Sequence, residues 1–133
     1  MQIDHIGYLV KNIEKSICEF KKIGFDIINI DDRNYIYDED RRCYIAFLVL
    51  NNTKIELVQP YDEESKLYSL LKNYSNQPYH ICLTSENLKR DEEFLSSNGF
   101  STVIEKQKAV AFKNRNVVFM FNNGTGIIEL LEK

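Results

Sequence analysis

Long apolar runs are missing from this chain of 133 residues. No run approaches the roughly 20 residues that a membrane-spanning helix needs, so no membrane partner is expected. The opening residues, MQIDHIGYLV, also lack the basic region that begins a secretory signal peptide. A cytoplasmic location is therefore the expectation.

The chain has no excess of positive charge and only three cysteines. The formal net charge is -3, which argues against a nucleic-acid partner, because such proteins need clustered cations. The three cysteines, Cys18, Cys43 and Cys82, are an odd number without the spacing of a metal-binding motif. They are interpreted as reduced and mostly buried thiols, in keeping with a cytoplasmic protein.

The composition is typical of one globular domain. Hydrophobic residues make up 44% of the chain and charged residues 28%, a balance found in folded rather than disordered proteins. A chain of this length can bury a core of its own. Residues 1–133 are therefore predicted to form a single domain.

The only two histidines reveal an internal repeat. His5 lies in DHIGYLVKNI and His80 in YHICLTSENL, so the two are 75 residues apart. At this offset Ile6 matches Ile81, Asn12 matches Asn87, Ile13 matches Leu88, and Gly24-Phe25 matches Gly99-Phe100. The repeat predicts two similar modules, about 1–60 and about 78–133, joined by a bridge over 61–77.

Each module reads as a β-α-β-β-β unit, which predicts an α+β fold. In the first, apolar patterns predict strands over 3–10, 25–31, 43–50 and 54–60, with a helix that Asn12 caps and Gly24 ends. In the second, strands are predicted over 79–84, 100–106, 108–113, 116–122 and 126–132, some of them short or fused, with a helix over 88–98. The charged residues 31–42 are predicted to be a loop or hairpin tip, and the bridge to hold a short helix on Leu67, Leu70 and Leu71.

Each module also has one glutamate near its end, within the tripeptide IEL at 55–57 and at 128–130. Taken alone, either glutamate is typical of an outward, solvated strand position, and either histidine of an ordinary polar residue. If the modules pair about a pseudo-twofold axis, the repeat predicts that His5, Glu56, His80 and Glu129 converge. Two nitrogen and two oxygen donors favour a site for a divalent ion such as Ni, Co, Zn, Mn or Mg.

A divalent ion held in this way predicts chemistry at the carbon next to a carbonyl group. The oxygen of a ketone, hemithioacetal or thioester bound to the ion is polarised, so the proton on the neighbouring carbon becomes acidic. A carboxylate beside the ion can take that proton and return it. Return to an adjacent carbon is an isomerisation, and return to the opposite face is an epimerisation. Glu129 and Glu56 are the predicted catalytic carboxylates, and no residue is assigned to binding the rest of the substrate.

These residues resemble the vicinal oxygen chelate superfamily, which includes glyoxalase I (lactoylglutathione lyase) and methylmalonyl-CoA epimerase. The segments DHIGYLVKNIEKSICEFKKIGF, NTKIELVQP, YHICLTSENL and GTGIIELLE are similar to the opening unit and the ligand strands of that family. The resemblance covers essentially the whole chain. It implies paired βαβββ modules that form an incomplete barrel, a homodimer, and four metal ligands, which are His5, Glu56, His80 and Glu129.

Two branches of the family fit different parts of the chain. Four ligands favour the glyoxalase and epimerase branch, since extradiol dioxygenases and fosfomycin-resistance enzymes typically use two His and one Glu. The segment KIELVQPYDEESKLYSLLKNYSNQPYHICL resembles the epimerase. However, Tyr79 stands where the family often has another histidine, and CYIAFLVL at 43–50 lacks the inner-strand acid of the epimerase. No glutathione-binding set of Arg and Asn is recognised. The sequence therefore does not identify the substrate.

The resulting prediction is a divalent-metal-dependent isomerase or lyase that acts on a small molecule, either lactoylglutathione lyase-like or methylmalonyl-CoA epimerase-like. The alternative within the family is a sequestering protein, as in bleomycin resistance, with the same fold and no catalysis. A third alternative is an interaction module without a ligand. Arg33, Arg41 and Arg42 could meet an anionic substrate tail, although salt bridges to the acids around them are the plainer interpretation.

Overall fold

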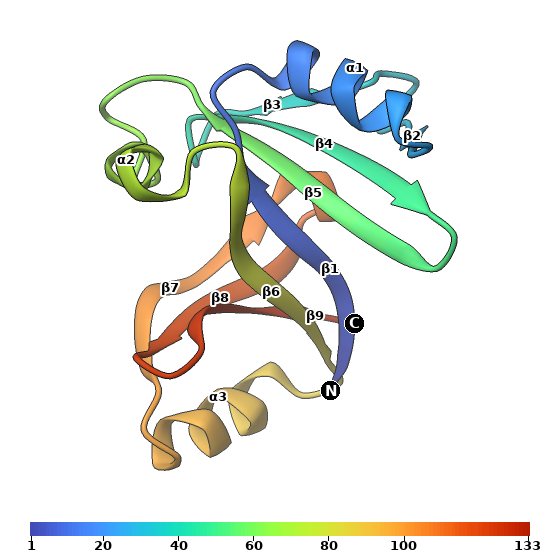
Figure 1. Ribbon diagram of the computed structural model, residues 1–133. Coiled ribbons are helices and arrows are strands. Elements are labelled where there is room, and N and C mark those ends of the chain that lie inside the picture. The colour runs from blue at the N-terminus through green and yellow to red at the C-terminus, as the bar shows by residue number, and fades with distance from the viewer. The chain divides into compact units, whose positions relative to one another are not determined.

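Nine strands and three helices make up the computed structural model, which describes residues 1–133 (Figure 1). In chain order they are β1 (Gln2–Leu9), α1 (Ile13–Lys22), β2 (Asp26–Ile28), β3 (Ile36–Asp38), β4 (Cys43–Leu50), β5 (Thr53–Pro60), α2 (Leu71–Tyr74), β6 (Gln77–Ser85), α3 (Leu88–Ser97), β7 (Ser101–Ala109), β8 (Arg115–Asn122) and β9 (Gly126–Glu132). Two short 3-10 turns, η1 (Tyr68–Leu70) and η2 (Val110–Phe112), complete the set. The predicted α+β class is confirmed, and no helix is long and apolar enough to cross a membrane.

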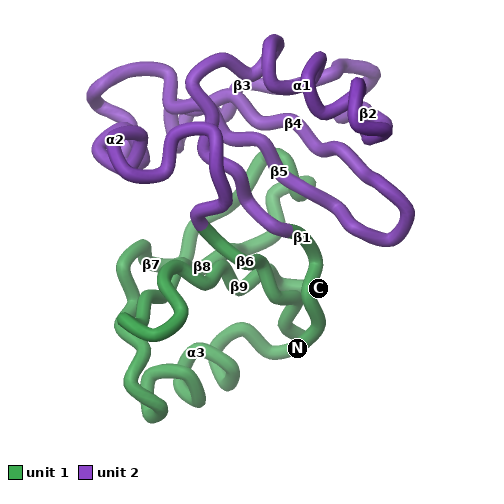
Figure 2. Tube along the Cα trace, in the orientation of Figure 1, with its two compact units in different colours: residues 1–5, 80–133 green, residues 6–79 purple.

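The chain divides into two compact units (Figure 2). Unit 1 holds residues Met1–His5 and His80–Lys133, and unit 2 holds Ile6–Tyr79. Strand β1 therefore contributes its first residues to unit 1 and its remaining residues to unit 2. The two units are described in turn.

In unit 2 the strands lie in the order β2-β4-β5-β1, and β3 pairs with another part of β4. Strands β4 and β5 form an antiparallel hairpin, whereas β1 runs parallel to β5 with Gly7 opposite Glu56. Helix α1 covers one face of this sheet. The core on that face contains Val10, Ile13, Ile17, Ala46, Leu48, Ile55 and Leu57. Because side chains alternate along a strand, Glu56 lies on the face opposite to α1.

In unit 1 the strands lie in the order β6-β9-β8-β7, with the first residues of β1 next to β6. Strands β6 and β9 are parallel, with Cys82 opposite Glu129, and the other neighbours are antiparallel. Helix α3 covers one face, where the core contains Leu88, Leu95, Val118, Met120, Ile128 and Leu130. By alternation, Glu129 lies on the other face. Each unit thus repeats one plan, with a helix on one face and a glutamate on the opposite face.

Two asparagines at equivalent places begin the long helices. The side-chain oxygens of Asn12 and Asn87 each accept a hydrogen bond from the backbone N–H three residues later, at 2.9 Å and 3.0 Å respectively. The glycines that follow the helices, Gly24 and Gly99, have φ angles of 101° and 86°, which residues with a Cβ rarely adopt. The predicted starts and ends of both helices are confirmed.

Asn12→Ala and Asn87→Ala are each expected to lower the free energy of unfolding by about 1 kcal/mol, because each change leaves a helix N–H without its acceptor. Urea unfolding followed by circular dichroism measures the loss. Asn12→Ser and Asn87→Ser are matched controls that still supply a capping oxygen and should stay close to the parent. An alanine variant as stable as the parent would show that the cap does not hold its helix.

Two predicted boundaries are wrong. Residues 31–42 were expected to be a loop or a hairpin tip. Residues 39–42 do join two antiparallel strands, but strand β3, which pairs with β4, was not predicted. This strand has only three residues and lies among charged ones, so it has no pattern of its own. The strand expected over 108–113 is also not formed. Strand β7 ends at Ala109, and η2 follows, because Lys113 and Asn114 adopt positive φ and turn the chain.

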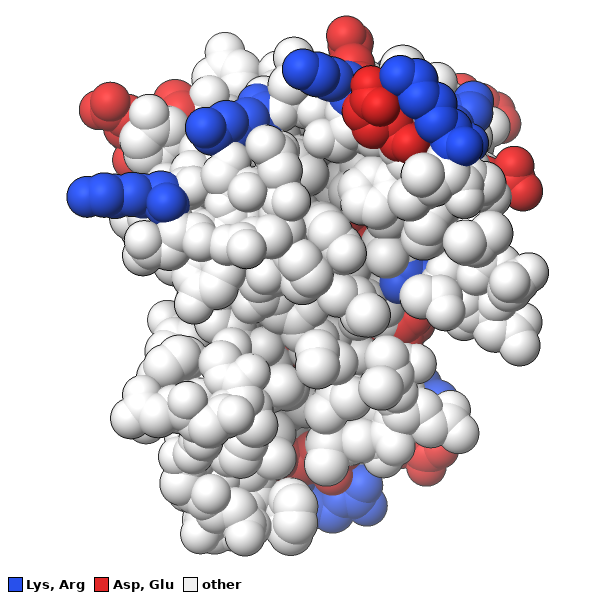
Figure 3. All heavy atoms as spheres, in the orientation of Figure 1, with Lys and Arg blue, Asp and Glu red and all other residues white.

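Ion pairs hold two of the three arginines within residues 31–42. Arg41 Nε lies 2.8 Å from Asp38 Oδ2 in a pair that is almost fully buried, and Arg42 pairs with Asp62. Arg41 thus has the expected kind of partner, an acid of the same stretch, although the pair is buried rather than solvated, whereas the partner of Arg42 lies outside the stretch. Charges of both signs also lie next to one another over α1 on the face seen in Figure 3.

The three cysteines are free thiols. Cys43 and Cys82 are buried, whereas Cys18 is exposed on α1. Burial raises the pKa of the Cys43 thiol to about 12, so this thiol stays protonated at neutral pH. The prediction of mostly buried, reduced thiols is confirmed.

Candidate metal centre

Three polar residues of unit 1 lie on the sheet face opposite to α3. Glu129 is in β9, and His80 is in β6, two residues before the Cys82 that pairs with Glu129. Because side chains alternate along a strand, His80, Cys82 and Glu129 share one face. His5 comes from the first residues of β1, the neighbour of β6. The exposed fractions of His5, His80 and Glu129 are only 1%, 4% and 0%.

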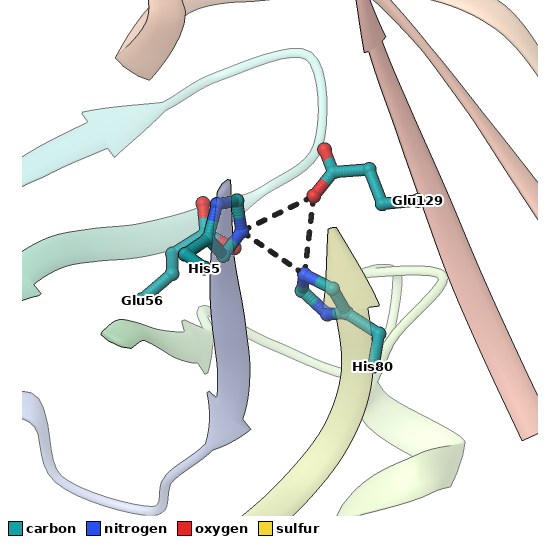
Figure 4. A group of neighbouring side chains, drawn as sticks. All are labelled: His5, Glu56, His80 and Glu129. Atoms are coloured by element: carbon teal, nitrogen blue, oxygen red, sulfur yellow. Dashed lines mark hydrogen bonds and ion pairs between the residues drawn. The ribbon is translucent and has the colours of Figure 1, made fainter. Parts of the chain in front are cut away.

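The donor atoms of these three side chains form a small triangle (Figure 4). His5 Nε2 lies 3.2 Å from His80 Nε2, and Glu129 Oε2 lies 3.3 Å from His5 Nε2 and 3.1 Å from His80 Nε2. Both carboxylate contacts are within ion-pair distance. The carboxylate oxygen thus faces the space between the two imidazoles, as ligands around a common centre do.

Two aromatic rings and one carboxylate hold the imidazoles in place. The ring of Phe112 in η2 stacks on His5 at a centroid distance of 5.5 Å, and the ring of Phe119 in β8 meets His80 edge-on at 5.7 Å. Asp4 Oδ1 lies 2.8 Å from His5 Nδ1. An ionised carboxylate only accepts hydrogen bonds, so His5 Nδ1 donates to Asp4 and Nε2 is the ring nitrogen that faces the triangle.

Sequence reasoning missed the three residues that support the imidazoles. Phe112 and Phe119 reach the histidines through tertiary packing, and nothing in their own spacing indicates it. Asp4 had one available signal, because it directly precedes His5 in the chain. Alternation along a strand nevertheless separates adjacent side chains, so adjacency alone does not predict the contact.

Burial and the two imidazoles act on the Glu129 carboxyl group in opposite directions. Burial raises its pKa, whereas the closeness of His5 and His80 lowers it, and the imidazoles prevail, so the pKa lies below its usual range. The group is therefore ionised at neutral pH. A buried carboxylate in this state needs positive charge close by.

These residues fit a divalent metal ion. Imidazole nitrogen and carboxylate oxygen are ordinary ligands of Zn, Ni and Co, at about 2.0–2.2 Å from the ion. Two such ligands at right angles are about 3.0 Å apart, which is close to the 3.1–3.3 Å that separates the three donor atoms. A cation among them would also neutralise the buried charge of Glu129.

Glu56 belongs to unit 2. Its Cα is paired with that of Gly7, which follows His5 by two residues in β1. The residue is buried, with an exposed fraction of 1%. An outward, solvated position is therefore wrong for Glu56, as it is for Glu129. Of the four predicted ligands, His5, His80 and Glu129 converge within unit 1, and the role of Glu56 stays a prediction.

The chain is similar to curated epimerases. It is 25% identical to the mitochondrial methylmalonyl-CoA epimerase of Dictyostelium discoideum over 136 residues, which cover 99% of this chain and 78% of that protein. It is 23% identical to an ethylmalonyl-CoA/methylmalonyl-CoA epimerase of Cereibacter sphaeroides over 121 residues, which cover 90% of this chain and 87% of that protein.

Solved structures share the fold. Methylmalonyl-CoA epimerase from Mycobacterium tuberculosis matches with a TM-score of 0.80 at 22% identity, covering 98% of this chain and 87% of that one. A hypothetical protein from Bacillus halodurans matches with a TM-score of 0.83 at 20% identity, covering 99% and 94%. These matches confirm the glyoxalase-like fold predicted from the sequence.

A family model described as Glyoxalase/Bleomycin resistance protein/Dioxygenase superfamily matches residues 4–119. The matched span includes His5, Glu56 and His80 and ends before Glu129. It takes in most of the chain and parts of both units. The chain therefore belongs to the glyoxalase/bleomycin resistance protein/dioxygenase superfamily.

Proposed function

We propose that this protein is a divalent-metal-dependent epimerase of a malonyl-CoA thioester that carries a substituent on its α-carbon. The observation that carries the proposal is the convergence of His5, His80 and Glu129, whose buried donor atoms lie within 3.3 Å of one another. The substrate class rests on the relatives, which are methylmalonyl-CoA and ethylmalonyl-CoA epimerases at 25% and 23% identity.

Glu56 is the proposed fourth ligand. It is the repeat equivalent of Glu129, in the same tripeptide IEL, and it is buried. Its partner Gly7 shares a strand face with His5, because the two are two residues apart in β1. Two imidazoles and two carboxylates would suit Ni, Co, Zn, Mn or Mg, and the ion would polarise a bound carbonyl oxygen.

The ion, when bound, supplies Lewis-acid polarisation of the thioester carbonyl, which makes the α-proton acidic. Glu129 is the proposed base. Its Oε2 is the oxygen next to the two imidazoles, and Figure 4 shows its Oε1 pointing away from both rings. Oε1 has no hydrogen-bond partner. It is therefore the atom available to accept the α-proton.

Inversion of the α-carbon requires a proton to return on the opposite face. Strand β4 offers no acid for this step, because the residues on its Glu56 side are Cys43, Ile45, Phe47 and Val49. Glu56 is therefore the proposed partner carboxylate of Glu129. The net change moves one proton between the faces of one carbon, so no redox partner is needed.

Solvent-deuterium incorporation tests the proposed function. Protein loaded with Co²⁺ or Ni²⁺ is expected to exchange the α-proton of methylmalonyl-CoA in D₂O, and chelator-treated protein is not. Mass spectrometry of the recovered thioester measures the exchange. Methylglyoxal–thiol hemithioacetals are the matched comparison, and turnover of these compounds alone would place the protein in the lyase branch. If neither class reacts and one binds tightly, the sequestering alternative replaces the epimerase.

A further inference from the structure

We infer that Asp4 is a positioning residue that fixes the imidazole of His5 and raises the affinity of the site for its ion. The inference rests on the proposed function, because it takes His5 to be a metal ligand. Asp4 is not one of the four predicted ligands. It would act on the ion only through the His5 side chain.

Asp4 meets the His5 ring on the edge away from the other donors. Its Oδ1 is 2.8 Å from Nδ1, while Nε2 is 3.2 Å from His80 Nε2 and 3.3 Å from Glu129 Oε2. The His5 side chain is fully buried and that of Asp4 is 19% exposed, so the contact is largely shielded from water. A charge-assisted hydrogen bond in such surroundings fixes both the tautomer and the direction of the ring.

Strand geometry alone does not impose this contact. Asp4 and His5 are adjacent in β1, and adjacent side chains point to opposite faces of a sheet. The carboxylate therefore turns back toward the ring of the next residue. Phe112 stacks on the same ring at 5.5 Å with the two planes 21° apart. The stacking limits tilting of the ring, and the hydrogen bond limits its rotation, so Nε2 stays aimed at the other donors.

The repeat supports its two histidines differently. Tyr79 stands before His80, where Asp4 stands before His5, so the second module has no carboxylate at this position. An ionised acceptor on Nδ1 makes Nε2 a stronger donor to a metal ion. The contribution of Asp4 is therefore specific to His5, and Tyr79 provides a matched control position.

A second ion is the competing interpretation of the same neighbourhood. Asp4, His5 and Cys82 also have donor atoms within 4.8 Å of one another. An ion there would require removal of the proton from His5 Nδ1 and of the thiol proton from the buried Cys82. The 2.8 Å separation of Asp4 Oδ1 and His5 Nδ1 is the length of a charge-assisted hydrogen bond, so one ion and one positioning carboxylate explain the cluster.

The affinity for Co²⁺ tests the inference, measured by competition with a chelator on protein purified without a histidine tag. Asp4→Asn keeps the size of the side chain and removes its charge, so its Kd is expected to rise about 10–100-fold. Tyr79→Phe should bind Co²⁺ like the parent. The unfolding midpoint of the metal-free Asp4→Asn protein should stay close to that of the metal-free parent, because the asparagine amide oxygen can still accept a hydrogen bond from His5 Nδ1.

Four other results of these measurements would overturn the inference, each for a different reason. An unchanged Kd for Asp4→Asn would show that Asp4 does not support His5, and would leave the proposed function standing. A lower metal-free midpoint with an unchanged Kd would make Asp4 merely structural. Two ions in the parent and one in Cys82→Ala would establish the second site instead. A parent that binds no Co²⁺ would remove the proposed function together with the inference.

Discussion

Replacing His5 or His80 with alanine is expected to abolish stoichiometric binding of a divalent ion. Each change removes a nitrogen donor and leaves the buried Glu129 carboxylate beside a single imidazole. Loss of a direct ligand should weaken binding by more than the roughly 10–100-fold typical of an outer partner. Plasma mass spectrometry of tag-free protein after gel filtration measures the metal content per chain.

Glu105→Gln is the control for these variants. Glu105 is an exposed carboxylate on β7 of the same unit, so its loss should leave one ion per chain. The same preparation and the same metal concentration apply to all variants. Full retention of the ion in the His5→Ala/His80→Ala double variant would contradict a site at these residues.

Glu129→Gln is expected to keep part of the bound metal and to slow α-proton exchange by on the order of 10²–10⁴. An amide oxygen can still contact an ion, but it cannot accept a proton at neutral pH. In the parent, burial raises the pKa of the Glu129 carboxyl, but the two imidazoles hold it below its usual range, so the group is ionised. Rates measured at saturating Co²⁺ separate the loss of the base from any loss of metal.

Glu56→Gln makes the same chemical change at the equivalent place in the first module. As the partner carboxylate, Glu56 should be needed for return of the proton on the opposite face more than for its removal. The Glu56→Gln protein should therefore retain deuterium exchange better than it retains inversion. Parent-like exchange in Glu129→Gln at full metal occupancy would exclude Glu129 as the base.

Much of the fold could be predicted because its pattern occurs twice. The helices begin at Ile13 and Leu88, directly after Asn12 and Asn87, as the repeat indicated. A single asparagine before an apolar stripe is a weak signal of a helix start. Its recurrence at the same offset from each histidine made it a strong one.

The burial of Glu56 and Glu129 could not be predicted from either strand alone. Alternation places each glutamate opposite its apolar neighbours, but it does not tell whether that face meets water. In the structure, Leu57 belongs to the core under α1 and Leu130 to the core under α3. The glutamates are nevertheless as buried as these leucines. Only the shared placement of histidine and glutamate in both modules indicated a common site.

Strand β3 depends on contacts that no periodicity encodes. It has three residues, and it ends at Asp38, a carboxylate with an exposed fraction of 0%. The turn that follows is held by Arg41, whose Nε and backbone N–H both donate to Asp38. The support of His5 by Phe112 is of the same kind, because the ring arrives from η2, far along the chain.

Anomalous diffraction from crystals grown with Co²⁺ tests the central claim most directly, because it locates the ion itself. One ion per chain is predicted, about 2.0–2.2 Å from Nε2 of His5, Nε2 of His80 and a carboxylate oxygen of both Glu56 and Glu129. An ion bound elsewhere, or none at these residues at a saturating concentration, would contradict the claim.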